Sequence, residues 1–108
     1  MLHLVLHVLV PAGVSYFWAK HRPESNWFAV FLILMVGMLI DVDHLLATPI
    51  YDPGRCSVGF HPLHTLIPIG CYLALFAHER TRIVGLGLLI HLALDSLDCR
   101  VNTGMWWT

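Results

Sequence analysis

A long apolar run from Trp27 to Ile40 ends directly in the tetrapeptide Asp41-Val42-Asp43-His44. Carboxylates and imidazoles are costly to bury beside such a run unless they are paired or bind a metal. Three other apolar runs, at residues 2–19, 62–77 and 83–97, also carry histidine, or histidine and aspartate. The chain must therefore fold its apolar segments so that these ionisable side chains find partners.

The composition predicts that the apolar runs are membrane helices. Hydrophobic residues make up 57% of the 108 residues and charged residues 12%, whereas a soluble domain is usually about a quarter charged. At about 1.5 Å per residue, the first run covers roughly 27 Å of a bilayer core of about 30 Å. We expect a single all-α domain over residues 1–108, an integral membrane four-helix bundle in up-down order. Its spans are predicted at residues 2–19, 27–47, 62–77 and 83–97.

The basic residues predict an orientation for this bundle. Two loops on one side hold Lys20, Arg22, Arg80 and Arg82, and the other side holds Arg55 and Arg100. Because cytoplasmic loops are enriched in Lys and Arg, we expect a multi-pass protein of the bacterial inner membrane. If the side with fewer basic residues is periplasmic, Cys56 and Cys99 can form a disulfide; otherwise they are free thiols.

The up-down order predicts that the ionisable residues meet near one membrane face. They lie at the start of the first run, the end of the second, the start of the third and the end of the fourth, which share one level in alternating helices. His91 and Asp95 are four residues apart and share a helix face, whereas Asp43 points about 200° away from Asp41. The predicted metal ligands are His7, Asp41, His44, His61, His64, His91 and Asp95.

Imidazole and carboxylate ligands without thiolates favour Zn²⁺ or another first-row divalent ion. The number of candidate groups suits one or two such ions, with the cluster toward the periplasmic face. In a hydrolytic site the metal lowers the pKa of a bound water to about 7. We expect Asp43 or Asp98 to orient a ligand or to act as the general base.

These motifs resemble a known group of proteins. His7, Asp41-x-Asp43-His44, His61-Pro-Leu-His64-Thr65 and His91-x-x-x-Asp95 are similar to motifs of bacterial inner-membrane-associated metal-dependent hydrolases. The chain looks closer still to a small uncharacterised family of bacterial membrane proteins. The hydrolases in turn resemble zinc-dependent phospholipase C in motif order. The resemblance implies a metal site and hydrolysis of a phosphoester, in which Arg55 would bind the phosphate or the developing charge.

The predicted function is therefore a membrane-bound metal-dependent hydrolase of a phosphoester in a lipid or amphiphile. Its expected partners are membrane lipid and a lipid-phosphate substrate, and so small a chain is also compatible with a homo-oligomer. A non-enzymatic divalent-metal protein, for binding, sensing or transport, is the alternative. Aspartate beside nearly every histidine argues against a haem bundle, and a formal net charge of −1 gives no basic surface for nucleic acid.

Overall fold

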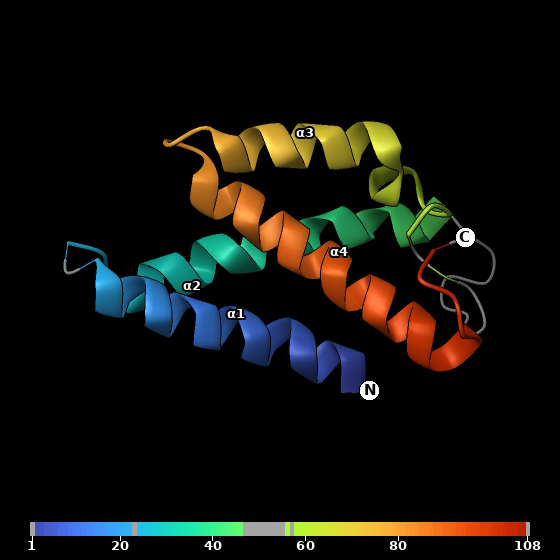
Figure 1. Ribbon diagram of the computed structural model, residues 1–108, viewed down its shortest axis with the longest axis horizontal. Coiled ribbons are helices and arrows are strands. Elements are labelled where there is room, and N and C mark those ends of the chain that lie inside the picture. The colour runs from blue at the N-terminus through green and yellow to red at the C-terminus, as the bar shows by residue number, and fades with distance from the viewer. Residues whose placement is uncertain (1, 23, 47–55, 57, 108) are drawn as a thin grey trace.

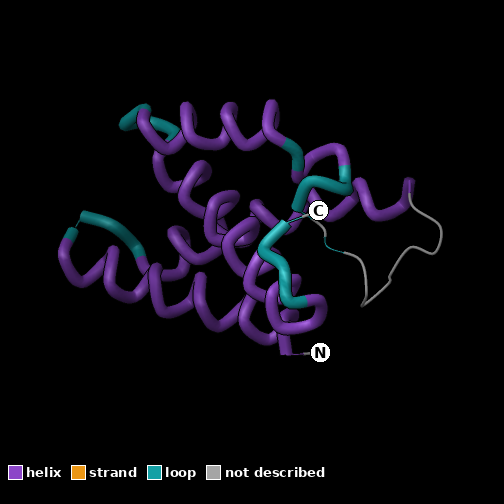
Figure 2. The backbone as a smooth tube through the Cα atoms, turned by 45° about the vertical axis from the view of Figure 1, so that its right-hand side comes forward, coloured by secondary structure: helices purple, strands orange, loops and turns teal. Residues whose placement is uncertain are grey.

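The computed structural model describes residues 2–22, 24–46, 56 and 58–107, except for the side chains of residues 2, 3 and 44. Every element within these ranges is helical, which confirms the all-α prediction (Figures 1 and 2). The elements are the α-helices α1 (Leu2–His21), α2 (Trp27–Met35), α3 (Leu66–Ala77) and α4 (Arg82–Thr103), and the 3₁₀ helices η1 (Val36–Leu46) and η2 (Pro62–His64).

Consecutive segments alternate in direction, as the sequence predicted. In Figure 1, α1 and α3 run from right to left, whereas α2 with η1 and then α4 run from left to right. Helix α4 lies in the middle and packs against α1, α2, η1 and α3. The start of α1, the end of η1, η2 and the second half of α4 therefore lie toward the same end of the molecule.

Local signals explain where α2 begins and where α4 ends. The Asn26 side chain caps α2, because its Oδ1 accepts hydrogen bonds from the backbone N–H groups of Phe28 at 2.9 Å and Ala29 at 3.1 Å. Helix α4 is capped by Gly104, whose φ of 82° suits a glycine at this position. The predicted end of the fourth span at residue 97 is six residues short of the observed end.

Helix α4 crosses α2 and η1 almost backbone to backbone. A Cβ atom at Gly87 would lie 2.6 Å from the carbonyl oxygen of Leu34, and one at Gly37 would lie 2.7 Å from that of Gly87. The buried hydrophobic core of Ile40, Tyr72, Leu88 and Leu92 adjoins this crossing. The close approach holds the acidic part of η1 beside α4.

No helix within the described part of the chain is both long enough and apolar enough to cross a membrane. The predictions of an integral membrane bundle, of a multi-pass inner-membrane protein and of a site near its periplasmic face are therefore wrong. The main reason is that two predicted spans are divided. The second becomes a nine-residue α-helix followed by 3₁₀ helix, and α3 has 12 residues, so they rise only about 14 and 18 Å as α-helix.

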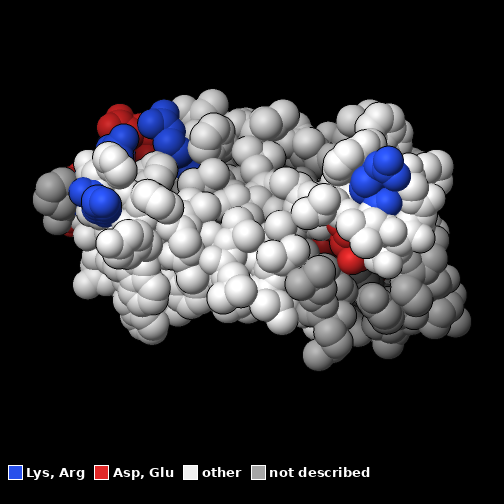
Figure 3. Space-filling model, turned by 60° about the horizontal axis from the view of Figure 1, so that its bottom comes forward, with Lys and Arg blue, Asp and Glu red and all other residues white. Residues whose placement is uncertain are grey.

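Charged side chains are distributed unevenly over one face of the molecule (Figure 3). Figure 3 shows Lys, Arg, Asp and Glu at the two ends of one face, with an uncharged middle between them. Large apolar side chains are exposed, among them Leu32 at 51% and Leu66 at 85%. Many apolar residues therefore stay outside the core, while several ionisable ones are buried inside it.

A disulfide joins Cys56 to Cys99, which is one of the two alternatives that the sequence left open. It joins the segment before η2 to the last turns of α4. The Ser96 hydroxyl also donates a hydrogen bond of 2.7 Å to the carbonyl oxygen of Trp106. These two links hold Cys56 and Trp106 against α4.

Candidate metal centre

Helix α4 supplies the central carboxylate of a buried polar group. Asp95 is 8% exposed and lies one turn after His91, which is 3% exposed. The Oδ2 atom of Asp95 is 3.0 Å from His91 Nε2 and also 3.0 Å from Nε2 of His64 in η2. This one buried oxygen therefore faces the Nε2 atoms of two imidazoles at the same distance.

Helix η1 supplies the second carboxylate of the group. Asp41 Oδ1 lies 3.0 Å from His91 Nε2 and 3.6 Å from His64 Nε2. One ligand atom from each of Asp41, His64, His91 and Asp95 lies within 4.8 Å of the others. This set, called the metal group below, can hold a metal ion. Its Asp41 side chain is 35% exposed and forms the open edge, whereas its other members are buried.

The second ring nitrogens of the two histidines have their own partners. His64 Nδ1 lies 2.9 Å from Asp43 Oδ2, and His91 Nδ1 lies 3.3 Å from the Met38 sulfur. If Nδ1 donates in each contact, the lone pair of Nε2 faces the metal group. A histidine ligand that donates its other N–H to a carboxylate is the usual arrangement at protein metal sites.

Asp43 lies behind His64 rather than in the metal group. Its Oδ2 accepts hydrogen bonds from the Leu63 backbone N–H at 2.8 Å and from His64 Nδ1, and its side chain is buried. Because a 3₁₀ helix has three residues per turn, Asp41 and Asp43 point about 120° apart. The two carboxylates of η1 therefore reach opposite nitrogens of the same imidazole.

Helix α1 contributes His7 next to the metal group. Its Nε2 lies 3.0 Å from Asp95 Oδ1, and its ring packs edge-on against that of His91 with the centroids 4.6 Å apart. His7 is 2% exposed. It holds the carboxylate oxygen that faces away from His64, so it supports the Asp95 side chain from the α1 side.

The remaining predicted site residues lie outside the metal group or outside the part of the chain that the structure describes. His61 is buried beside His64, with ring centroids 5.7 Å apart, but is not part of the metal group. Asp98 accepts a hydrogen bond from Asn102 on the outside of α4. Arg55 and the side chain of His44 lie outside the described residues. Met38 was not predicted, although its position three residues before Asp41 could have indicated it.

The metal group holds protons tightly when no metal is bound. Burial disfavours imidazolium, but hydrogen bonds to Asp41, Asp95 and Asp43 outweigh it and raise the pKa of His64 to about 10. Against the same effect of burial, bonds to Asp41 and Asp95 raise the pKa of His91 to about 9. Burial likewise disfavours charged carboxylates, yet the histidine contacts hold the pKa values of Asp41 and Asp95 well below their usual range.

These pKa values predict how the stability of the metal-free protein depends on pH. A pKa raised on folding contributes stability that is present below the unfolded value of about 6.5 and is lost as pH rises through the folded value. The free energy of unfolding in the presence of a chelator should therefore fall between about pH 6.5 and pH 10. Urea unfolding at several pH values measures it. A His64→Gln/His91→Gln variant should lack most of this slope, and an equal slope in that variant would contradict the assignment.

An all-helical fold with a buried group of two histidines and two aspartates defines a class of candidate metal-binding helical proteins. The chain belongs to a family of unknown function, DUF6122, whose model matches residues 1–102 and so includes the whole metal group. No curated protein and no solved structure shows significant similarity to the chain. Nothing in these comparisons links it to hydrolases or to phospholipase C, so that resemblance remains a prediction.

Proposed function

We propose that the protein is a metal-dependent hydrolase that binds a divalent ion, with zinc the best candidate, at His64, His91 and Asp95, with Asp41 at the open edge of the site. The observation that carries the proposal is the convergence of these four ligand atoms within 4.8 Å. They come from η1, η2 and α4, which are far apart in the sequence. Imidazole and carboxylate ligands without thiolates suit zinc and other first-row divalent ions.

Charge balance supports a divalent ion in this position. At neutral pH His64 and His91 carry two imidazolium protons in the metal-free group, because their pKa values are about 10 and about 9. A metal ligand histidine must be neutral, so binding displaces these protons. Two protons and one divalent ion carry the same charge. The exchange therefore leaves the net charge of this buried group unchanged.

Unequal exposure within the metal group favours catalysis over a closed structural site. His64, His91 and Asp95 are buried and supply two imidazoles and one carboxylate, a ligand set that catalytic zinc sites combine with a water molecule. When bound, the metal would supply a water of lowered pKa and a Lewis acid for a phosphoester oxygen. Asp41, at the open edge, is placed to accept a proton there.

A non-enzymatic metal protein is the second candidate, and the presence of four donors favours it. Four protein ligands fill a tetrahedral zinc site and leave no position for a substrate. The two candidates differ in the role of Asp41. In the hydrolase Asp41 accepts a proton during the reaction and is not needed to hold the metal. In a closed site Asp41 is an obligatory metal ligand.

The substitution Asp41→Asn tests the hydrolase directly. With zinc-loaded protein and bis(4-nitrophenyl) phosphate as the probe, we expect the variant to keep its zinc and to lose activity by about 10²–10⁴-fold. Glu79→Gln, at an exposed turn far from the metal group, is the control and should retain full activity. Wild-type protein that holds zinc but hydrolyses no phosphoester, with zinc lost from Asp41→Asn, would contradict the hydrolase and support the second candidate.

A further inference from the structure

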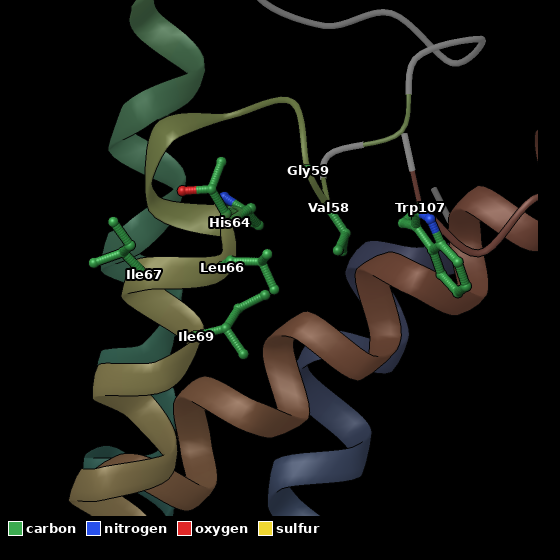
Figure 4. A pocket seen from close by; sticks show the side chains of 8 residues that line it. Val58, Gly59, His64, Leu66, Ile67, Ile69 and Trp107 are labelled. Carbon is green, nitrogen blue, oxygen red and sulfur yellow. The ribbon is translucent and has the colours of Figure 1, made fainter.

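An apolar pocket adjoins the metal group at the start of α3. Its volume is about 760 Å³, within the range of about 300–1,000 Å³ of ligand pockets in proteins. The residues that shape it include Val58, His64, Leu66, Ile67, Ile69 and Trp107 (Figure 4). No Lys, Arg, Asp or Glu is among its described lining residues, so the pocket suits an uncharged apolar group.

His64 is shared between this pocket and the metal group. His64 is among the residues that line the pocket, its side chain is fully buried, and its Nε2 faces Asp95 and Asp41 at 3.0 and 3.6 Å. In Figure 4, Leu66 and Ile69 project from α3 toward the space that Trp107 borders from the opposite side. A molecule in the pocket would therefore have an apolar environment along its length and would lie beside one residue of the metal group.

Covalent and hydrogen-bonded links hold two walls of the pocket in place. The Cys56–Cys99 disulfide lies two residues before Val58, and the Ser96 bond to the Trp106 carbonyl lies one residue before Trp107. On the third side, η2 and α3 are held by Tyr72, whose hydroxyl donates to the Leu63 carbonyl at 2.8 Å. These links restrict the residues next to the pocket walls, and such restriction lowers the entropic cost of binding.

We propose that the pocket binds the alkyl chain of a single-chain amphiphile and presents its phosphate ester to the metal group. For the phosphate end of the ligand, this inference rests on the proposed function. For the alkyl chain of the ligand, it rests on the pocket alone. Each methylene that leaves water for an uncharged apolar wall makes the free energy of binding more favourable. The metal group can attract only the anionic end of the ligand.

Chain-length dependence tests the proposal. Hexyl, octyl and decyl phosphate, each below its micelle-forming concentration, are titrated calorimetrically into zinc-loaded protein, with inorganic phosphate as the probe without a chain. We expect one site and an affinity that rises about three- to fourfold for each added methylene, until the chain exceeds the pocket. Equal affinities for all three alkyl phosphates, with inorganic phosphate still bound, would overturn the pocket and leave the metal site standing.

A pair of matched variants locates the binding site. Leu66→Glu places a charge at the pocket wall, and its high exposure makes it compatible with folding; Leu32→Glu places the same charge on α2, away from the pocket. We expect Leu66→Glu to weaken decyl phosphate binding at least about tenfold, without changing phosphate binding, because the chain must share the wall with a charge. Leu32→Glu should bind like the wild type. Equal behaviour of the two variants would place the chain elsewhere and overturn the proposal.

Metal removal separates this inference from the proposed function. If removal of zinc abolishes the contribution of the phosphate group to the binding affinity, and the affinity still depends on chain length, both this inference and the proposed function are supported. If the chain-length dependence persists while zinc never alters the affinity for phosphate, the pocket is supported as a chain-binding site and the proposed function fails.

Discussion

Asp95→Asn is expected to weaken zinc binding by more than about 100-fold, while the protein keeps its fold. The carboxylate of Asp95 lies 3.0 Å from the Nε2 atoms of three histidines, His7, His64 and His91. The amide has the same shape but no charge, so it removes the negative ligand and the partner that orients the imidazoles. Loss of a residue that only supports a ligand already costs about 10–100-fold in metal affinity, and loss of a ligand should cost more.

Competition with a zinc chelator at constant pH measures this affinity. The same substitution at Asp98, one turn further along α4, is the matched comparison. Asp98 contacts Asn102 and is not part of the metal group, so Asp98→Asn should bind zinc within about twofold of the wild type, a difference of only about 0.4 kcal/mol. Wild-type affinity in Asp95→Asn, or an equal loss in both variants, would contradict the assignment of Asp95.

Asp43→Ala is expected to weaken zinc binding by about 10–100-fold and to lower the free energy of unfolding by about 1–3 kcal/mol. The first effect follows because Asp43 Oδ2 orients His64 through Nδ1 at 2.9 Å. The second follows because the Leu63 N–H, which donates to the same oxygen at 2.8 Å, loses its acceptor. Zinc competition measures the first effect and urea unfolding of the metal-free protein the second.

Asp43→Asn separates these two roles of Asp43. The amide oxygen can still accept the Leu63 N–H, so most of the stability should return. The charge that makes His64 a better ligand is absent, so zinc affinity should stay below that of the wild type. Recovery of full zinc affinity in Asp43→Asn would show that the charge of Asp43 does not matter to the metal group. Wild-type affinity in Asp43→Ala would contradict its supporting role altogether.

Much of the candidate site could be predicted from the spacing of a few residues. Asp95 follows His91 by four positions, which places both on one face of any α-helix. Alternation of the helix directions then brings this face, the end of the second apolar run and the start of the third to one level. The same reasoning predicted His7, whose Nε2 lies 3.0 Å from Asp95. These predictions need only helix periodicity and short connections.

The different positions of Asp41, in the metal group, and of Asp43, behind His64, could not be predicted. An α-helix would place them about 200° apart, and the sequence gives no sign that residues 36–46 wind as a 3₁₀ helix instead. Such runs rarely exceed three or four residues, and a longer one often marks a functional segment. Here the tighter winding accompanies contacts of Asp41 and Asp43 with opposite nitrogens of His64.

Composition misled the prediction of a membrane bundle, because it counts apolar residues without locating them. The second run is divided after Met35, and large side chains such as Leu66 are exposed instead of filling a core.

The observed end of α4 could have been predicted from local signals in the sequence. Asn102 four residues after Asp98, followed by Gly104, is typical of a helix that continues to a glycine cap, and α4 does extend to Thr103.

The metal content of the purified protein tests the central claim most directly. Wild-type protein and Asp95→Asn, prepared in parallel without chelators, are compared by elemental analysis. The metal group predicts about one tightly held divalent ion per wild-type chain and little in the variant. Wild-type protein without stoichiometric metal, and unable to take up zinc after dialysis against it, would contradict the account.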